Sequence, residues 1–199
     1  IYDTFGGNNT AYIVMQFLKG HDVKDVLNAE GPMPYERARD IILHVCDSLA
    51  PVHAKGIIHR DISPDNIFLT DDGEVKLLDF GAARYESSVN SKSLSVILKA
   101  GYAPEEQYRS KGDQGPWTDV YALAETFYKI LTGVTPPDSM ERAVRDEIRE
   151  PSKMGVAIPQ SAENALMNAL NIRKVDRTQS VEDFKAALQT DAVERVKVK

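Results

Sequence analysis

Two short polar motifs, separated by a predicted β-hairpin, constrain the fold of this chain more than any other sequence feature. The first is HRDISPDN at residues 59–66, and the second is DFG at residues 79–81. Between them, two apolar runs flank DDG at residues 71–73, a sequence typical of a tight hairpin turn. Because a hairpin returns the chain to its starting point, we expect the second motif to lie beside the first.

Together these motifs supply the side chains that phosphoryl transfer requires. Asp61, on a tight loop fixed by Pro64, can accept the proton of a hydroxyl nucleophile, and we predict that it is the catalytic carboxylate. The amide oxygen of Asn66 and the carboxylate of Asp79 are hard oxygen ligands, and we predict that they hold Mg²⁺. Turn or helix-cap roles are the alternative, since Asp and Asn are common at such positions.

With these motifs, the chain resembles the C-terminal lobe of a eukaryotic-like, bacterial-type serine/threonine protein kinase. The resemblance extends over nearly all of the 199 residues. It implies an α+β, mainly α-helical fold, a protein-kinase-like C-lobe with short β-hairpins and most of the N-lobe missing. Residues 1–17 would then be a residual N-lobe hairpin and the start of the hinge, residues 18–189 the C-lobe, and residues 190–199 a tail or linker.

The resemblance also implies a binding site for ATP. The family's hinge would run from Gln16 to Leu18, with its backbone pairing with adenine, and Met15 would be the gatekeeper behind the adenine pocket. Phe68, two residues after the predicted metal ligand Asn66, matches the position that floors the adenine ring. A simple core position is the alternative for Phe68.

One position departs from the family pattern at a place that matters for catalysis. Serine/threonine kinases usually carry a Lys two residues after the catalytic Asp, where it reaches the γ-phosphate, but this chain has Ser63. Lys99 stands near the place where the family usually has a Thr that lies against that Asp. We therefore predict that the Lys99 ammonium fills the space left at Ser63, with a solvent-exposed Lys99 as the alternative.

The segment from Asp79 to Glu106 corresponds to the family's activation segment, and it carries a serine-rich stretch before YAPEEQ at residues 102–107. We hypothesise phosphorylation at one of three serines in it, Ser91, Ser93 or Ser95. The family's acidic residue at the end of this segment matches either Glu105 or Glu106, and the flanking Tyr and Gln favour Glu106. Its partner would be Arg177, in a buried ion pair.

Three further residues should support the predicted catalytic loop, residues 59–66, rather than react. In the family, His59 and Phe80 would stack in an internal hydrophobic spine. Asp119, which opens a central helix, would brace the backbone of the turn at residues 59–61. All three are therefore predicted to be structural.

Apolar residues at helical spacing predict the helices. The helix beginning at Tyr35 should end by Lys55, and Pro51 should kink it or end it early. Residues 120–131 are apolar nearly all round, which is typical of a central buried helix capped by Gly133. The other predicted helices are 22–29, a charged and exposed 138–150, 162–172, and 180–188 with a Ser180/Asp183 capping box.

Composition and charge indicate which binding partners and which cellular compartment to expect. The net charge of −6 disfavours a nucleic-acid partner or an anionic membrane surface. Cys46 is the only cysteine, which excludes an internal disulfide and favours a core-packing role in a reducing compartment. No apolar run approaches the roughly 20 residues of a membrane span, so we expect no membrane contact in this segment. The expected location is cytoplasmic, either alone or as the cytoplasmic domain of a longer protein.

The sequence contains no G-x-G-x-x-G loop, no strand lysine in a V-A-I-K context and no helix supplying its glutamate partner. In the family these parts clamp the β- and γ-phosphates of ATP. We therefore expect the intact parent to transfer the γ-phosphate of ATP to Ser/Thr hydroxyls of a protein substrate, using Mg²⁺, and this chain alone to be inactive.

Two other classes of protein share parts of this pattern. A pseudokinase-like binding or scaffold module keeps the lobe as an interaction surface, but the retained Asp61, Asn66 and Asp79 argue against it for the parent. A small-molecule phosphotransferase shares the Asp-to-Asn loop. It normally lacks the long serine-rich segment that this chain carries, so the protein kinase remains the leading hypothesis.

Overall fold

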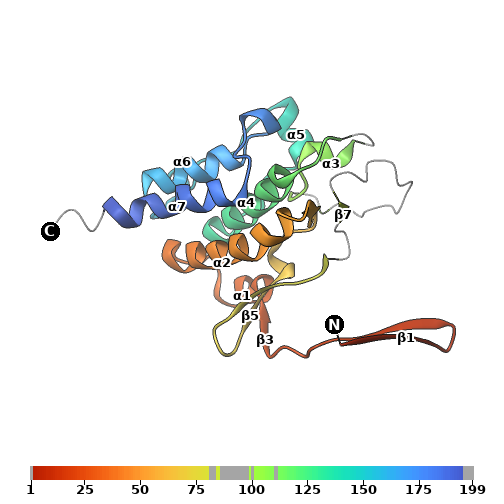
Figure 1. Cartoon of the computed structure of the whole chain (residues 1–199). Coiled ribbons are helices and arrows are strands. Elements are labelled where there is room, and N and C mark those ends of the chain that lie inside the picture. The colour runs from red at the N-terminus through yellow and green to blue at the C-terminus, as the bar shows by residue number, and fades with distance from the viewer. Residues whose placement is uncertain (1, 81–83, 86–98, 100, 110–111, 195–199) are drawn as a thin grey trace.

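The computed structural model describes residues 2–80, 84–85, 99, 101–109 and 112–194 (Figure 1). The longer helices form one body, and the first hairpin extends away from it near the N-terminus. This arrangement of helices with short antiparallel sheets confirms the predicted mainly helical fold class. Within the described ranges, no helix combines the length and the apolar character that crossing a bilayer requires.

The N-terminal hairpin consists of β1 (Asp3–Gly7) and β2 (Thr10–Val14), which pair antiparallel. Its turn is Asn8-Asn9, where φ is +50° and +58°, a left-handed conformation that asparagine tolerates. The rings of Phe5 and Tyr12 stack across the strands with centroids 5.0 Å apart. Nearly all side chains of both strands are exposed, so the predicted hairpin is confirmed but packs little against the helical body.

A second, three-stranded antiparallel sheet carries the catalytic loop's hairpin. Its strands are β3 (Gly20–Asp22), β5 (Ile67–Thr70) and β6 (Val75–Leu77), with β5 in the middle. The pairing of β5 with β6 confirms the hairpin predicted between the two motifs. Gly20 lies at φ +140°, and a Cβ there would come within 2.1 Å of the Leu69 carbonyl oxygen. Only glycine therefore allows β3 to join the sheet at this point.

Four helices enclose the hydrophobic core. They are α2 (Tyr35–His53), α4 (Pro116–Thr132), α6 (Gln160–Ala169) and α7 (Val181–Glu194). As predicted, α4 is buried on almost every side, and its backbone ends at Gly133 with φ +73°. The largest fully buried apolar side chains come from all four helices, among them Ile42, Leu49, Leu123, Phe127, Leu166 and Phe184. Cys46 is part of this core, and burial raises the pKa of its thiol to about 12.

Short elements connect these helices and hold the loops of the site. They are α1 (Val23–Glu30), β4 (Ile57–Ile58), η1 (Pro64–Asn66), β7 (Arg84–Tyr85), α3 (Glu105–Tyr108), α5 (Ser139–Val144), η3 (Pro151–Met154) and η4 (Lys174–Asp176). One half of the predicted capping box is present, because Ser180 Oγ accepts the Asp183 N–H at 3.1 Å. The Asp183 carboxylate accepts the Ser180 hydroxyl at 2.6 Å, where a capping box would have it accept the Ser180 backbone N–H.

Two predicted helix boundaries are wrong. The helix predicted over 138–150 is only the short α5. It is also not exposed throughout, because Arg142 turns inward to pair with Glu125 at 3.1 Å and is 3% exposed. Of the two effects predicted for Pro51, a kink or an early end, the early end is not seen, because Pro51 lies in the last turn of α2, which continues to His53. The last helix, α7, continues past Leu188 to Glu194, so the tail that we placed from residue 190 begins as helix.

Candidate active site

A buried carboxylate on α4 holds the HRDISPDN loop in place. The Asp119 side chain is fully buried, and its two oxygens accept the backbone N–H groups of His59 and Arg60, each at 2.8 Å. His53, at the end of α2, contacts the same carboxylate through Nε2 at 2.8 Å. This confirms the bracing role predicted for Asp119 and fixes the backbone just before Asp61.

The backbone is strained on both sides of the site. Arg60 has φ +71° and Asp79 has φ +59°, a conformation that residues other than glycine seldom adopt. Among the described residues, the only other non-glycine positions with positive φ are Asn8 and Asn9 in the hairpin turn. Both strained positions are therefore at the predicted site: Arg60 directly precedes Asp61, and Asp79 is itself a predicted metal ligand.

His59 packs beneath the loop as a neutral ring. Its Nε2 lies 3.1 Å from the Leu78 carbonyl oxygen, and its Nδ1 accepts the Asp61 N–H at 3.3 Å, so the ring proton belongs on Nε2. Burial lowers the pKa of His59, against the opposing charge of Asp119. The ring meets Phe80 edge-on with centroids 4.5 Å apart, which confirms the predicted packing contact.

Asn66 is fixed to Asp61 by two hydrogen bonds. Its Nδ2 donates to the Asp61 carbonyl oxygen at 2.7 Å and to the Asp61 carboxylate at 2.9 Å. Because both bonds use the amide nitrogen, Oδ1 is the atom left to bind a cation. The side chain is 8% exposed, so this orientation is held firmly.

The β5–β6 hairpin returns the chain to Asn66. The Leu78 N–H donates to the Asn66 carbonyl oxygen at 2.8 Å, and Asp79 follows directly. One amide oxygen and one carboxylate fit Mg²⁺, which takes oxygen ligands and completes its shell with water and phosphate oxygens. In the described part of the chain, no group of three or more His, Cys, Asp or Glu side chains is arranged to bind a metal by protein ligands alone.

The Lys99 ammonium lies inside the catalytic loop. It donates to Ser63 Oγ at 2.9 Å and to Asp65 Oδ2 at 2.9 Å, and it is 3.4 Å from Asp61 Oδ1. Burial alone would raise the pKa of Asp65, but hydrogen bonds from Lys99 and Ser63 outweigh it and lower that pKa. The position is the one that we predicted from the Ser63 departure, while its role in catalysis stays a prediction.

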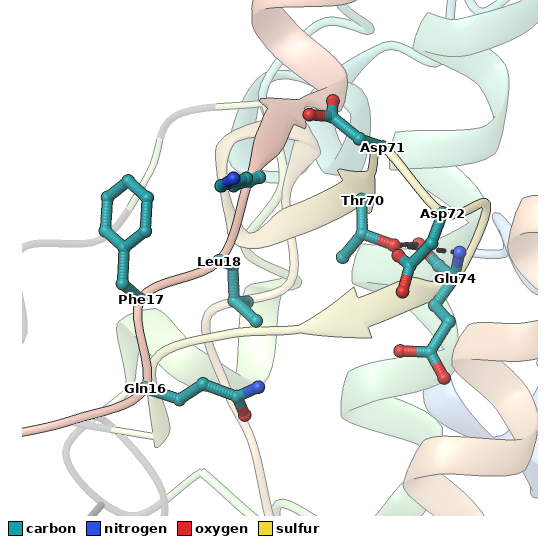
Figure 2. Close-up of a pocket in the computed structure, with 8 residues that line it drawn as sticks. Gln16, Phe17, Leu18, Thr70, Asp71, Asp72 and Glu74 are labelled. Carbon is teal, nitrogen blue, oxygen red and sulfur yellow. Dashed lines mark hydrogen bonds between the residues drawn. The ribbon is translucent and has the colours of Figure 1, made fainter.

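The four residues assigned to adenine do not line one common pocket. Gln16 and Leu18 line a pocket of about 350 Å³ opposite residues 70–74 of the β5–β6 turn (Figure 2). Met15 and Phe68 do not line this pocket; Met15 is 60% exposed, and Phe68 is half-buried on β5. The nucleotide roles of all four residues stay predictions.

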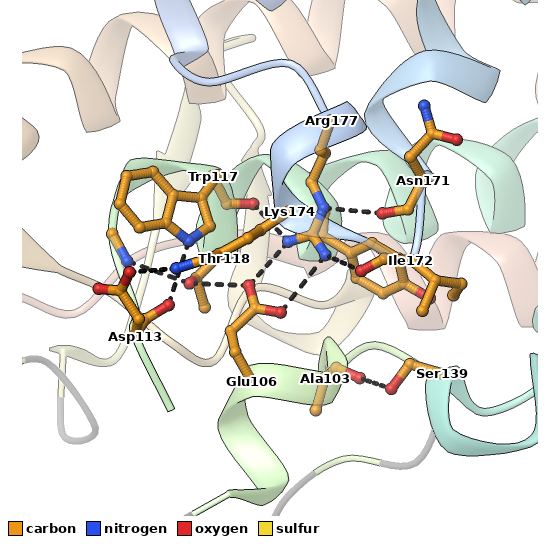
Figure 3. Close-up of polar contacts among 12 residues, drawn as sticks. Ala103, Glu106, Asp113, Trp117, Thr118, Ser139, Asn171, Ile172, Lys174 and Arg177 are labelled. Carbon is orange, nitrogen blue, oxygen red and sulfur yellow. Dashed lines mark hydrogen bonds and ion pairs between the residues drawn. The ribbon is translucent and has the colours of Figure 1, made fainter. Parts of the chain in front are cut away.

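A buried ion pair ties the end of the activation segment to the C-terminal part of the chain (Figure 3). Arg177 Nη1 lies 2.7 Å from Glu106 Oε1, and Nη2 lies 3.3 Å from Oε2. The guanidinium also donates to the carbonyl oxygens of Trp117, Asn171 and Ile172 at 2.8–3.0 Å. The predicted pair is confirmed, with Glu106 and not Glu105 as the partner. The serines hypothesised to be phosphorylated, Ser91, Ser93 and Ser95, lie outside the described residues.

Comparison of the sequence with known proteins identifies the family. Residues 1–196 match the family model described as a protein kinase domain. The chain belongs to the protein kinase family. Among curated relatives, a probable serine/threonine-protein kinase of Clostridium perfringens is 36% identical to this kinase chain over 181 residues. The serine/threonine-protein kinases PknB of Mycobacterium leprae and PrkC of Bacillus subtilis are 33% and 32% identical over 200 and 198 residues.

These alignments cover 87%, 94% and 96% of the kinase chain, but 26%, 32% and 30% of the three relatives. The chain therefore spans between a quarter and a third of the length of the curated relatives that it matches. Their names confirm the predicted resemblance to bacterial-type serine/threonine kinases.

Two polar residues of this kinase site were missed from the sequence. Asp65 holds the Lys99 ammonium, and its place two residues after Ser63 in the catalytic loop was the available signal. Gln107 donates through Nε2 to the Arg60 carbonyl oxygen at 2.9 Å, so α3 is tied directly to the catalytic loop. In the sequence, Gln107 was used only as a flanking residue that favoured Glu106 over Glu105 as the partner of Arg177.

Proposed function

We propose that the intact parent of this chain transfers the γ-phosphate of ATP to Ser/Thr hydroxyls of a protein substrate, with Mg²⁺ as cofactor. The observation that carries the proposal is the pair of Asp61 and Asn66 side chains on one braced loop, with the Lys99 ammonium reaching into that loop from outside it. A carboxylate beside an amide ligand and an ammonium can orient a hydroxyl and offset phosphate charge, which is most of what phosphoryl transfer asks of a protein.

Each side chain then has a defined task. Asp61 orients the substrate hydroxyl and receives its proton, while Asn66 Oδ1 and the Asp79 carboxylate hold the metal. Bound Mg²⁺ supplies positive charge to the phosphate oxygens. Lys99 takes over the phosphate-facing charge that a Lys at position 63 normally provides, and Ser63 and Asp65 keep its ammonium in place. Gln16, Leu18, Met15 and Phe68 contact adenine.

The relatives' names support a protein Ser/Thr substrate over the two alternatives, a scaffold module or a small-molecule phosphotransferase. We propose a cytoplasmic location for the kinase domain, because ATP is supplied there. We also propose that the 199-residue chain is inactive by itself, since its sequence contains no glycine-rich loop or V-A-I-K lysine to clamp the phosphates.

The test is transfer of labelled γ-phosphate by the intact parent to a set of peptides whose single hydroxyl is Ser, Thr or Tyr. We expect label on Ser and Thr peptides, with loss of transfer when EDTA removes Mg²⁺, and no transfer by the 199-residue chain. ATP binding without transfer to any peptide or to the parent itself would instead indicate a scaffold module. Transfer confined to small-molecule hydroxyls would indicate the phosphotransferase class.

A further inference from the structure

A pocket lined by three lysines adjoins the catalytic loop. It has a volume of about 410 Å³ and lies between α1, the catalytic loop, the residues around Tyr102 and the end of α4. The polar and charged side chains in its lining are Lys24, Asn28, Asp65, Lys99, Lys129 and Thr135. This pocket shares no lining residue with the one beside Gln16 and Leu18, so it is separate from the predicted nucleotide side.

The pocket connects directly to the predicted reaction centre. Lys99 forms part of its wall and is also 3.4 Å from the Asp61 carboxylate. A peptide whose hydroxyl reaches Asp61 would therefore place a neighbouring side chain in this pocket. The occupant is thus expected to be a part of the protein substrate, because the nucleotide is assigned to the separate pocket beside Gln16 and Leu18.

The electrostatics of the lining favour an anion. Three ammonium groups face one carboxylate, and that carboxylate, Asp65, is already paired with Lys99 at 2.9 Å. Lys129 donates to the Gly133 carbonyl oxygen, an interaction that leaves its positive charge in place. Lys24 is exposed on the first turn of α1, and its side chain makes no hydrogen bond or ion pair with any other described residue. Two ammonium charges therefore remain without a carboxylate partner in the lining.

We propose that this pocket binds an acidic side chain of the protein substrate, so that the kinase selects Ser/Thr sites with a neighbouring Glu, Asp or phosphorylated residue. The proposal rests on the proposed function, because it assigns the pocket to the substrate of the Asp61 site. Opposite charges that pair in a half-enclosed pocket discriminate against a peptide that places a Lys there.

The experiment compares kcat/KM of the intact parent for peptides with one Ser acceptor. At each neighbouring position in turn, the peptide carries Glu, phosphoserine, Gln or Lys. At one position we expect the kcat/KM of the Glu and phosphoserine peptides to exceed that of the Lys peptide by about tenfold. A Lys24→Glu variant should abolish or reverse that preference, whereas Lys55→Glu, at an exposed lysine beyond α2, should keep it. Glu suits the first turn of a helix, so Lys24→Glu is expected to fold.

Equal kcat/KM for Glu and Lys peptides at every position, or an acidic preference unchanged in Lys24→Glu, would overturn the inference while leaving the proposed function intact. A second measurement does not need catalysis: the affinity of the intact parent for the Glu peptide and for the Lys peptide, each labelled with fluorescein. Acidic preference in binding that Lys24→Glu removes would support the pocket even if no transfer were seen, and that result would count against the proposed function alone.

Discussion

An Asp61→Asn variant of the intact parent is expected to transfer phosphate about 10²- to 10⁴-fold more slowly than the wild type. An amide cannot receive the hydroxyl proton, and it removes the negative charge 3.4 Å from the Lys99 ammonium. The substitution keeps the shape of the side chain and an oxygen that can accept the hydrogen bond from Asn66. The measurement is kcat with labelled ATP, with thermal unfolding of both proteins as a check that the fold is unchanged.

Asp65→Asn is the matched control for that variant. The Asp65 carboxylate contacts the same ammonium at 2.9 Å, but the Asn66 amide donates to the carboxylate of Asp61 and not to that of Asp65, so the loss of Asp65 should slow transfer far less than the loss of Asp61. If Asp61→Asn retained most of the wild-type kcat, or if Asp65→Asn were the more damaging change, Asp61 would not be the catalytic carboxylate.

An Arg177→Met variant is expected to lower the free energy of unfolding by about 3–5 kcal/mol. Methionine fills part of the space but leaves the Glu106 carboxylate, which is 5% exposed, without its charge partner. Three backbone carbonyl oxygens also lose their donor. For a domain of this size the loss corresponds to a fall in the melting temperature of roughly 10 °C, measured by thermal unfolding of the intact parent.

Arg173→Met provides the control for Arg177→Met. The Arg173 side chain is 76% exposed, and its pair with Asp176 spans 3.6 Å, so its removal should leave the melting temperature almost unchanged. A double variant that also carries Glu106→Leu should recover part of the stability, because it removes the stranded charge. A fall of less than about 2 °C in Arg177→Met would show that this pair does not hold the segment to the helices.

The catalytic loop could be predicted closely because its parts follow one another at fixed spacing. The order of Asp61, Asn66, a hairpin and Asp79 specifies which backbone groups meet, and the Leu78–Asn66 hydrogen bond is the result. Asp119 and Glu106 were likewise assigned from motif positions, and both make the contacts expected of them.

Sequence patterns did not reveal contacts between charged residues that are far apart in the chain. The charges around Arg142 suggested a solvent-exposed helix, yet its guanidinium is buried against Glu125 and Tyr121 on α4. Burial raises the pKa of Glu125 to about 8, with the pull of Tyr121 and Arg142 in the opposite direction. Such a pair becomes visible only once α5 is packed on α4, because each residue alone looks like an ordinary surface charge.

The residues assigned to adenine also show that sequence patterns do not reveal contacts made by long-range packing. The resemblance identifies the hinge by its place after the hairpin, but the walls of a pocket come from long-range packing. In the structure Gln16 and Leu18 face the β5–β6 turn, whereas Met15 is mostly exposed. Their assignment to ATP therefore depends on the family and not on the spacing of the residues.

The most direct test of the account is the rate of phosphoryl transfer by the intact parent carrying Lys99→Met, alone and combined with Ser63→Lys. We predict that Lys99→Met lowers kcat about 100-fold, because the phosphate-facing charge is lost. Ser63→Lys should restore most of the rate, since Ser63 Oγ lies 2.9 Å from the Lys99 ammonium and a lysine at position 63 reaches the same space. A wild-type rate in Lys99→Met would contradict the account, and so would a double variant as slow as Lys99→Met alone.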